Sequence, residues 1–350
     1  MPELSSEKAF LEDPPEFHEK LLDYGERPYW SPDGQRIAFV EKNFGDVCEM
    51  DFASREVRNL TRDNGPFHHF LRVLFLSNGD YLLIGPRTLE DAETSRFGKS
   101  ELWIMDREAS APPQPLGRTI FEGCAVSTHA PRIAYSVHER IDSSTGAPED
   151  FEIRVADIDY SSGTAALVDN QVIYRTRNGR CPEPQDFRRG DSEVIFAEYV
   201  NRFPRRNTLD WKTVVKGVEI ETGAVRTYIE EHLTHNEPEG IFPDGEHICL
   251  ESSSDFENYW PPIDLWKLKL DGSGRRVRMT RSIDHAPWRC SNSNVSPDGK
   301  WLAFMVNTRG DMSGYGRGLG LLDLEQWAQS SAGQQWESPN AGGIKTESQH

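Results

Sequence analysis

The stretch Trp30–Val40 reads W-S-P-D-G-Q-R-I-A-F-V, and residues 295–306 repeat it as V-S-P-D-G-K-W-L-A-F-M-V. In both copies a Pro-Asp-Gly turn is followed by a short run rich in apolar residues. Proline presets φ at the second turn position, aspartate accepts from its own backbone, and glycine supplies the left-handed residue. The run behind the turn suits an antiparallel return strand. Each copy therefore predicts a β-hairpin.

Four weaker copies of this hairpin lie between the two. Each has a turn followed by a β-rich run, and the turns are Leu76–Gly79, Thr128–Pro131, Arg188–Asp191 and Phe242–Gly245. The repeat length is 45 to 60 residues, since the six turns centre near residues 33, 78, 130, 190, 244 and 298. A repeat of this length is typical of a four-stranded propeller blade.

Each hairpin is followed by a third β-rich run and, in most units, by a fourth. The third runs lie at residues 47–52, 101–106, 151–158, 214–220, 263–270 and 318–324. The last unit lacks a fourth run, because residues 328–350 are polar and rich in glycine and serine, whereas Phe17–Leu22 before the first hairpin offers the missing strand. We therefore predict an all-β fold: a six-bladed β-propeller of four-stranded antiparallel blades, with its ring closed by the N-terminal strand so that no edge is exposed there.

Three sequence patterns carry a family resemblance. The W-S-P-D-G-x-x-I-A-F pattern, L-W-I-M-D at 102–106 and I-D-L-W-K-L-K-L-D-G at 263–272 resemble the TolB-like, WD-repeat-like propeller repeat. The resemblance covers about residues 17–327, leaving an N-terminal arm at 1–16 and a flexible tail at 328–350. Residues 235–245 also resemble single-domain members of this group. Such propellers serve as binding platforms, peptidase accessory domains and enzymes, so the resemblance implies the fold and leaves the function open.

Composition excludes several classes of function. The 57 acidic residues outnumber the 39 Lys and Arg, giving a net charge of −18, so we expect no nucleic-acid partner and no anionic membrane. Five scattered cysteines, an odd number, favour buried free thiols. The N-terminus has no apolar signal segment, and no apolar run approaches the ~20 residues of a membrane span. We expect a cytoplasmic monomer.

The expected loops divide the propeller into two unlike faces. Hairpin turns are tight, whereas loops between second and third strands are long, at residues 85–100, 138–150, 201–210, 252–262 and 307–317. Long loops on a rigid scaffold are where function usually lies. Their aromatic tips, Tyr259, Trp260 and Tyr315, could stack on a sugar or anchor a protein.

The innermost strand of each blade brings polar groups to the same face. The expected channel residues are Arg27, His68, His69, Arg72, Glu122, Glu183, Gln185, Asp186, His235, Asn236, Glu237, Glu239, Arg289, Asn292 and Asn294. Converging polar groups of mixed charge in a concavity favour a small-molecule site. A channel that holds only ordered water is the alternative.

The segment His235–Glu239 (H-N-E-P-E) is the expected centre of the site. Glu237 and Glu239 share a strand face, where mutual repulsion could raise one pKa; pairing with Arg27 or Arg289 is the alternative. Carboxylate–imidazole pairs suit acid–base catalysis. The candidate catalytic residues are His235, Glu237, Glu239, Glu183 and His68, and the remaining channel residues, with Tyr259 and Trp260, are candidates for ligand binding.

A metal site is the main alternative to metal-free acid–base catalysis. Histidines 68, 69 and 235 with a neighbouring glutamate are suitable ligands, and oligogalacturonate lyases, propellers of related repeat type, hold a metal on a histidine cluster. Here the sixth blade offers Asn292 and Asn294 in place of imidazole, so we expect no metal and no other cofactor. The favoured function is binding of a polar or carbohydrate-like small molecule, with lyase or hydrolase chemistry. The alternative is a protein–protein interaction platform without catalysis.

Overall fold

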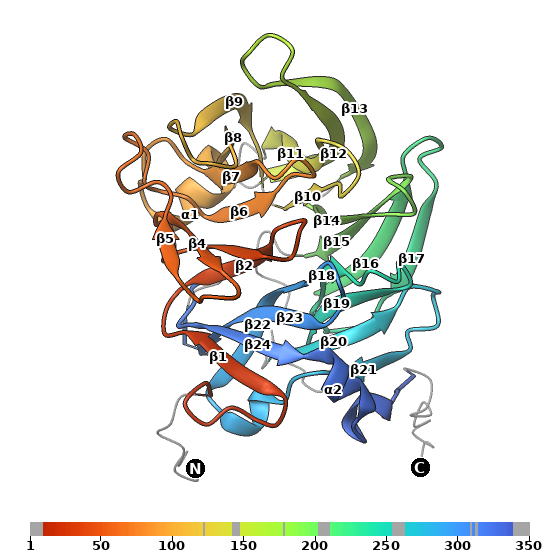
Figure 1. Cartoon of the computed structure of the whole chain (residues 1–350). Helices are drawn as coiled ribbons and strands as arrows, with labels where there is room; N and C mark the ends of the chain where they lie inside the picture. Colours follow the sequence, from red (N-terminus) through yellow and green to blue (C-terminus); the bar gives the residue numbers. More distant parts are fainter. Residues whose placement is uncertain are drawn as a thin grey trace.

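The chain folds into six four-stranded antiparallel sheets arranged as blades of a ring (Figure 1). The computed structural model describes residues 10–121, 123–141, 148–177, 179–201, 211–253, 263–308, 310–311 and 314–338. The predicted all-β, six-bladed propeller is confirmed.

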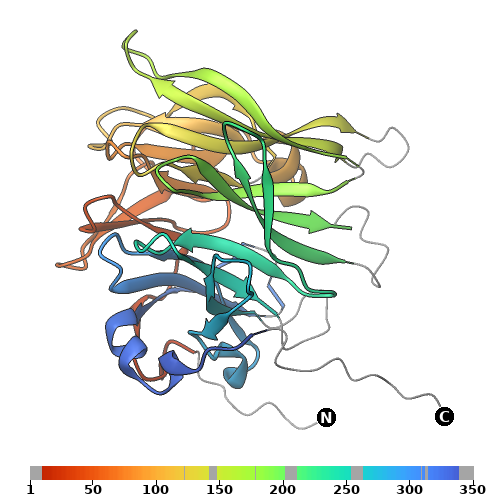
Figure 2. The ribbon, with the colours of Figure 1, turned by 90° about the vertical axis from the view of Figure 1, so that its right-hand side faces the viewer.

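Blades 1 to 3 follow one another along the first half of the chain. Blade 1 consists of β2 (Glu26–Trp30), β3 (Arg36–Val40), β4 (Val47–Asp51) and β5 (Val57–Asn59). Blade 2 consists of β6 (Arg72–Phe75), β7 (Tyr81–Gly85), β8 (Glu101–Met105) and β9 (Gln114–Thr119). Blade 3 consists of β10 (Cys124–Val126), β11 (Arg132–Ile141), β12 (Pro148–Asp159) and β13 (Ala166–Thr176). Figure 2 shows β11 to β13 reaching beyond the rest of the ring.

Blades 4 to 6 take the second half. Blade 4 consists of β14 (Cys181–Arg188), β15 (Glu193–Val200), β16 (Lys212–Glu219) and β17 (Val225–Ile229). Blade 5 consists of β18 (Asn236–Ile241), β19 (His247–Ser252), β20 (Asp264–Lys269) and β21 (Arg276–Arg278). Blade 6 consists of β22 (Trp288–Val295), β23 (Trp301–Thr308), β24 (Leu319–Asp323) and the N-terminal strand β1 (His18–Leu22).

Ring closure depends on β1, the outermost strand of blade 6. It pairs antiparallel with β24, with His18 opposite Leu322 and Lys20 opposite Gly320. The predicted closure by the N-terminal strand is therefore confirmed, and the sheet of blade 6 joins the two ends of the propeller.

The two strongest sequence repeats form the same turn. In blade 1 the Ser31 hydroxyl donates to Asp33 and accepts the backbone N–H of Arg36. In blade 6 Ser296 makes the equivalent bonds, donating to Asp298 and accepting from Trp301. The glycine of each turn has a positive φ, 68° in the first and 74° in the second, which explains why both copies carry Gly after Asp.

The core fills the spaces between blades. Between blades 1 and 6, Ile37 and Met50 pack with Met305 and Leu321, and all four are fully buried. The five cysteines are all buried free thiols, so their expected burial is confirmed. Figure 1 shows β2, β6, β10, β14, β18 and β22 nearest the centre, and these strands position the candidate site.

Five short helices lie between or after the strands in the described part of the chain. They are α1 (Ala92–Thr94), the π-helical turn η1 (Ser95–Lys99), the 3-10 turns η2 (Ser282–His285) and η3 (Ala332–Gln334), and α2 (Leu324–Gln329). Beyond η3, Trp336 packs against the core cluster between blades 5 and 6, and Glu337 forms a β-bridge with Arg276 of β21. Residues 328–338 thus lie against the propeller.

Candidate functional site

Four of the six innermost strands carry a β-bulge. In β2, Glu26 pairs with Val40 and Tyr29 with Ala38, so two residues, 27 and 28, lie opposite one. Equivalent register shifts place Gln185 of β14, Glu239 and Gly240 of β18, and Asn292 and Ser293 of β22 outside regular pairing. β6 and β10 pair without a shift. Bulges re-aim side chains and are over-represented beside active sites.

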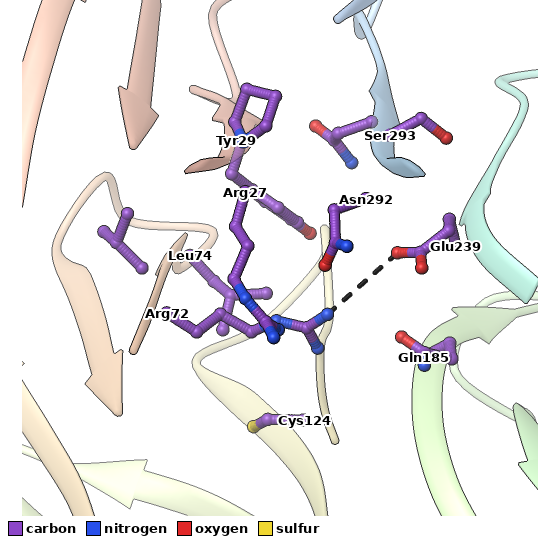
Figure 3. Close-up of a pocket in the computed structure, with 12 residues that line it drawn as sticks. Arg27, Tyr29, Arg72, Leu74, Cys124, Gln185, Glu239, Asn292 and Ser293 are labelled. Atoms are coloured by element: carbon purple, nitrogen blue, oxygen red, sulfur yellow. Dashed lines mark ion pairs between the residues drawn. The ribbon is translucent and has the colours of Figure 1, made fainter. Parts of the chain in front are cut away.

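The bulged residues converge on one narrow cavity between the innermost strands (Figure 3). Its lining is Arg27, Pro28, Tyr29, Arg72, Val73, Leu74, Cys124, Gln185, Glu239, Asn292, Ser293 and Asn294. It leaves about 20 Å³ for the centres of water molecules, which is room for one or two waters and not for a sugar ring. The cavity can therefore receive only a small chemical group of a ligand.

Two lining residues adopt a left-handed backbone conformation. Arg27 has φ 52° and Asn292 has φ 45°. Asparagine tolerates this region, but arginine does so at a cost of order 1–3 kcal/mol. The surrounding fold maintains that conformation at the cavity, a pattern common at ligand sites.

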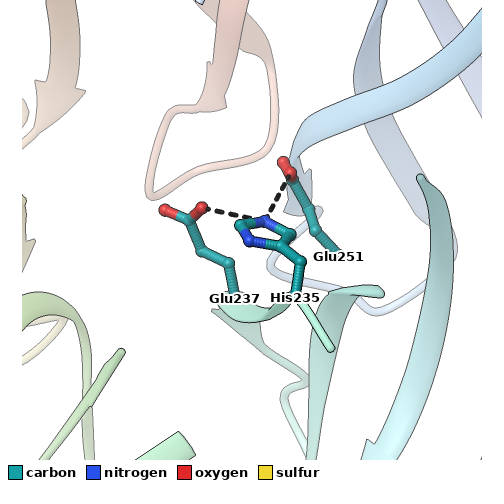
Figure 4. Close-up of side chains that lie close together, drawn as sticks. All are labelled: His235, Glu237 and Glu251. Carbon is teal, nitrogen blue, oxygen red and sulfur yellow. Dashed lines mark ion pairs between the residues drawn. The ribbon is translucent and has the colours of Figure 1, made fainter. Parts of the chain in front are cut away.

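A histidine between two carboxylates lies beside this cavity (Figure 4). Nε2 of His235 is 3.3 Å from Glu237 Oε2 and 3.8 Å from Glu251 Oε2. On the other side of the ring, Nδ1 is 3.4 Å from the hydroxyl of Thr213. The His235 and Glu237 side chains are each 15% exposed and Glu251 is 5% exposed, so a ligand can reach the first two.

The cluster shifts two pKa values in ways that bear on proton transfer. Burial lowers the pKa of His235, but hydrogen bonds and charges from Glu237 and Glu251 outweigh it and raise the pKa to about 9. Burial raises the pKa of Glu239 well above its ordinary value, and the charges of Glu251 and Glu237 add to the effect. At neutral pH His235 is therefore an imidazolium, whereas burial and neighbouring negative charge both favour the neutral form of Glu239.

Glu251 is a member of the site that the sequence did not predict. It lies in β19 within the apolar run I-C-L-E-S, directly opposite Glu237 in the strand register. Regular pairing extended from Ile241 and Ile248 would place Ser252 opposite Glu237, so it is the bulge that brings Glu251 there. Glu251 also accepts the backbone N–H of Asn292, which joins the bulge of β22 to blade 5.

Two contacts connect the cavity to the histidine cluster. Gln185 Nε2 of blade 4 donates to Glu237 Oε1 at 3.1 Å. The backbone N–H of Asn292, another lining residue, donates to Glu251 of the cluster. Within the cavity itself, the Arg72 guanidinium of blade 2 lies 4.0 Å from Glu239 Oε2, the ion pair drawn in Figure 3. Cavity and cluster are therefore parts of one continuous site.

The structure brings eight of the predicted residues to this site: Arg27, Arg72, Gln185, His235, Glu237, Glu239, Asn292 and Asn294. Asn294 also accepts the backbone N–H of Trp30, which fixes its amide between blades 6 and 1. Their catalytic and binding roles stay predictions.

Three predicted residues bond elsewhere. Asn236 points to the opposite face of β18, where it donates to Glu231 and accepts from Ser252, because neighbouring strand residues alternate between faces. Asp186 accepts the backbone N–H groups of residues 187 and 241, and its burial raises its pKa to about 7. Arg289 donates to Asn307 of the neighbouring strand.

The other predicted residues are placed away from the cavity or cannot be placed. His68 precedes β6, and its Nδ1 lies 2.9 Å from Asp46 Oδ1, with 39% of the His68 side chain exposed. His69 is half-buried and Glu183 is buried against the backbone of Gly123, and neither lines the cavity. Tyr315 is exposed. Predictions for Glu122, Tyr259 and Trp260 lie outside the described residues.

The histidine cluster also has the chemical composition of a metal site. The potential ligand atoms of His235, Glu237 and Glu251 all lie within 4.8 Å of one another. One imidazole and two carboxylates suit a divalent transition metal. The ion pairs among the three side chains satisfy the same atoms without a metal, and the expectation of a metal-independent site stays a prediction.

No protein-family model matches the chain, and no curated protein matches it in sequence. Within the residues that the structure describes, no helix is long and apolar enough to cross a membrane.

Solved structures share the fold at low sequence identity. A gluconolactonase from Xanthomonas campestris is 12% identical, with a TM-score of 0.53 over 87% of this chain and 88% of that one. An oligogalacturonate lyase in complex with manganese is 14% identical, with a TM-score of 0.51 over 87% and 79%. TolB from Acinetobacter baumannii is 11% identical, with a TM-score of 0.49 over 87% and 63%. The two structures with TM-scores above 0.5 show that the chain shares their fold.

Proposed function

We propose that the protein is an enzyme that binds a polar small molecule at the channel mouth and transforms it by acid–base chemistry. The observation that carries the proposal is His235 held between Glu237 and Glu251, beside a cavity lined by bulged strands. Titratable groups with strongly shifted pKa values in a concavity are typical of active sites.

The two accessible members of the cluster have complementary roles. Glu237 is the base, because its carboxylate is reachable and is oriented by Gln185 and His235. The imidazolium of His235 is the acid: it donates a proton to the leaving-group oxygen, or to an oxygen on which negative charge develops. Glu251 is a positioning residue, since it is buried and holds both His235 and the β22 backbone.

This arrangement suits lyase or hydrolase chemistry. In a lyase, Glu237 removes a proton from carbon and the leaving group takes one from the acid. In a hydrolase, Glu237 removes the proton from an attacking water. The names of the two enzymes with the same fold, a gluconolactonase and an oligogalacturonate lyase, make sugar acids and their lactones the first ligands to test.

A thermal-shift screen of sugar acids, lactones and other polar metabolites tests binding, and turnover of each hit tests catalysis. A ligand at 100 times its Kd stabilises the native state by about 2.7 kcal/mol. The variant Glu237→Gln should fold and lose turnover. Glu221→Gln, the same change in an exposed turn of blade 4, is the matched control and should keep it.

The alternative function is a protein-interaction platform. Tyr315 and Tyr24 are exposed aromatic side chains that could contact a partner. If no small molecule shifts the melting temperature, and a pulled-down partner is lost on Tyr315→Ser but not on Glu237→Gln, the platform replaces the enzyme. A cytoplasmic, monomeric protein is expected under either function and remains to be tested.

A further inference from the structure

The side chains of His235, Glu237 and Glu251 direct one atom each towards a common centre (Figure 4). Nε2 of His235 lies 3.3 Å from Glu237 Oε2 and 3.8 Å from Glu251 Oε2. Two ligand atoms of a tetrahedral zinc ion lie about 3.4 Å apart, because each bond to the metal is about 2.1 Å long. The potential ligand atoms of the three residues all lie within 4.8 Å of one another, so small rotations of the glutamate side chains would bring them to such separations.

The second polar atom of each side chain contacts a neighbouring group. Gln185 Nε2 donates to Oε1 of Glu237 at 3.1 Å, and a backbone N–H of the β22 bulge donates to Oε1 of Glu251. The hydroxyl of Thr213 lies 3.4 Å from Nδ1 of His235. Contacts of this kind orient metal ligands and fix the imidazole tautomer. The atoms that they leave directed at the centre, Nε2 and the two Oε2 atoms, are the ones that would bind a metal.

The strand pairing brings two like charges together at this centre. Glu237 and Glu251 lie directly opposite each other in β18 and β19. Like charges at opposite positions destabilise a sheet, and a cation between them removes the repulsion. The backbone of His235 is fixed at the end of the same two strands, because its N–H donates to the Ser253 hydroxyl and its C=O accepts the Ser253 N–H.

Access and ligand chemistry select the kind of ion. The side chains of His235 and Glu237 are each 15% exposed, so an ion can enter and keep water molecules on its open side. One imidazole and two carboxylates suit zinc and related first-row metals, whereas calcium and magnesium prefer oxygen ligands alone. The net charge of −18 raises the concentration of cations near the protein.

We propose that His235, Glu237 and Glu251 bind one divalent transition-metal ion, with zinc as the best match, and that this ion blocks the acid and the base of the site. The ion takes the lone pair of Nε2, and the proton that Nε2 carries is released to water. Binding stands on the geometry alone, whereas the block of turnover rests on the proposed function. The ion is thus a reversible inhibitor and not a cofactor.

Zinc binding to the full chain tests the inference without any substrate. Bound metal is first removed with EDTA and the EDTA is dialysed away, and the affinity for zinc is then measured by competition with a chromophoric chelator. We expect one equivalent to bind saturably, with calcium binding roughly 10-fold more weakly or less. The five cysteines are buried, so their thiols offer no competing site in the folded protein.

Three variants test the location of the ion. His235→Asn and Glu237→Gln each remove one ligand and should weaken zinc binding by about 100-fold or more. Thr213→Val removes only the hydroxyl beside Nδ1 and should weaken binding by about 10-fold, the lower end of the loss for an outer-shell partner. His68→Asn is the matched control: it removes a histidine that contacts another carboxylate, Asp46, and should bind zinc like the wild type. Circular dichroism checks that each variant is folded.

The outcomes separate this inference from the proposed function. Absence of saturable zinc binding, or binding unchanged in both ligand variants, overturns the zinc site even if Glu237→Gln abolishes turnover. An equal loss of binding in His68→Asn and His235→Asn also overturns it. Where turnover is found, zinc should inhibit it and EDTA should restore it, and activation by zinc overturns the blocking role. Zinc binding with no turnover of any small molecule overturns the enzyme and leaves the zinc site standing.

Discussion

Blades 2 and 5 both bring a histidine and charged residues to the start of their innermost strands, but only the histidine of blade 5 lies in the candidate site. Before β6 the chain reads H-H-F-L-R at 68–72, and at β18 it reads H-N-E-P-E at 235–239. His68 pairs with Asp46 in a loop at the rim, with 39% of its side chain exposed. His235 lies between two carboxylates, one of which is buried.

The different positions of His68 and His235 follow from the lengths and pairing of β6 and β18. β6 has four residues and pairs with β7 without interruption, so His68 lies outside the sheet altogether. β18 has six residues and a bulge after Pro238, so the chain from His235 to Glu239 runs along the channel wall. Strand length and a bulge, rather than the density of polar residues, place the histidine of blade 5 in the site and leave that of blade 2 outside it.

The largest expected effect is on turnover. His235→Asn in blade 5 should lower kcat by about 10²–10⁴, the usual contribution of one acid–base group. His68→Asn in blade 2 should leave kcat unchanged, because His68 lies outside the cavity. Steady-state kinetics on a ligand found by the thermal-shift screen compares the two. An equal loss of kcat in both variants would show that His68 of blade 2 also contributes to the chemistry, and would contradict the difference between the two blades.

The same contrast should appear in stability. Glu251→Ala leaves the imidazolium of His235 and a backbone N–H of β22 without their buried acceptor, which should cost about 3–5 kcal/mol. His68→Ala removes an exposed pair and should cost about 0–1 kcal/mol. Urea unfolding followed by tryptophan fluorescence measures both. A Glu251→Ala cost below 1 kcal/mol would mean that the cluster is not charged in the native state.

The pH dependence of stability sharpens the comparison further. The groups facing His235 are Glu237 of β18, Glu251 of β19 and the Tyr199 ring of β15. Its pKa rises from 6.5 to about 9 on folding, so the native state binds its proton more tightly. Its contribution, about 3 kcal/mol, is complete below pH 6.5 and is lost as the pH rises through 9.

His235→Gln should remove that part of the stability profile. The wild type and the variant should differ most below pH 6.5 and converge above pH 9. A constant difference across this range would contradict the raised pKa of His235.

The fold could be predicted because its signals are local. A Pro-Asp-Gly turn fixes a hairpin within a few residues, as at Pro32 and Pro297, and six hairpin turns spaced 45 to 60 residues apart, most of them weaker copies, fix the number of blades. Closure also followed from counting strands, since the last blade lacked one and residues 17–22 could supply it.

The site was less predictable because it depends on strand register. Simple alternation placed Glu237 and Glu239 correctly, and it also explains why Asn236 faces away. Bulges have no single sequence signature, so the turning of Gln185 and Asn292 into the cavity could not be derived residue by residue. Glu251 was missed because an isolated glutamate in an apolar strand reveals its partner only once the register is known.

The two blades also differ at their outer edges, and this gives the smallest predicted effect. β9 of blade 2 is exposed along much of its length. β21 of blade 5 is covered by the chain beyond α2, where residues 276 and 337 exchange both backbone hydrogen bonds. Trp336 is half-buried there, 5.5 Å from the His247 ring and 5.6 Å from the Arg275 guanidinium.

Deleting residues 333–350 should therefore destabilise the protein by about 1–2 kcal/mol, since it removes a half-buried tryptophan and uncovers a strand edge. Deleting residues 339–350 removes none of these contacts and is the control. Urea unfolding of both truncations measures the cost, and gel filtration detects association through the uncovered β21 edge. If the two truncations are equally stable and both remain monomeric, the segment after η3 is not a structural part of blade 5, and the edges of blades 2 and 5 are equivalent.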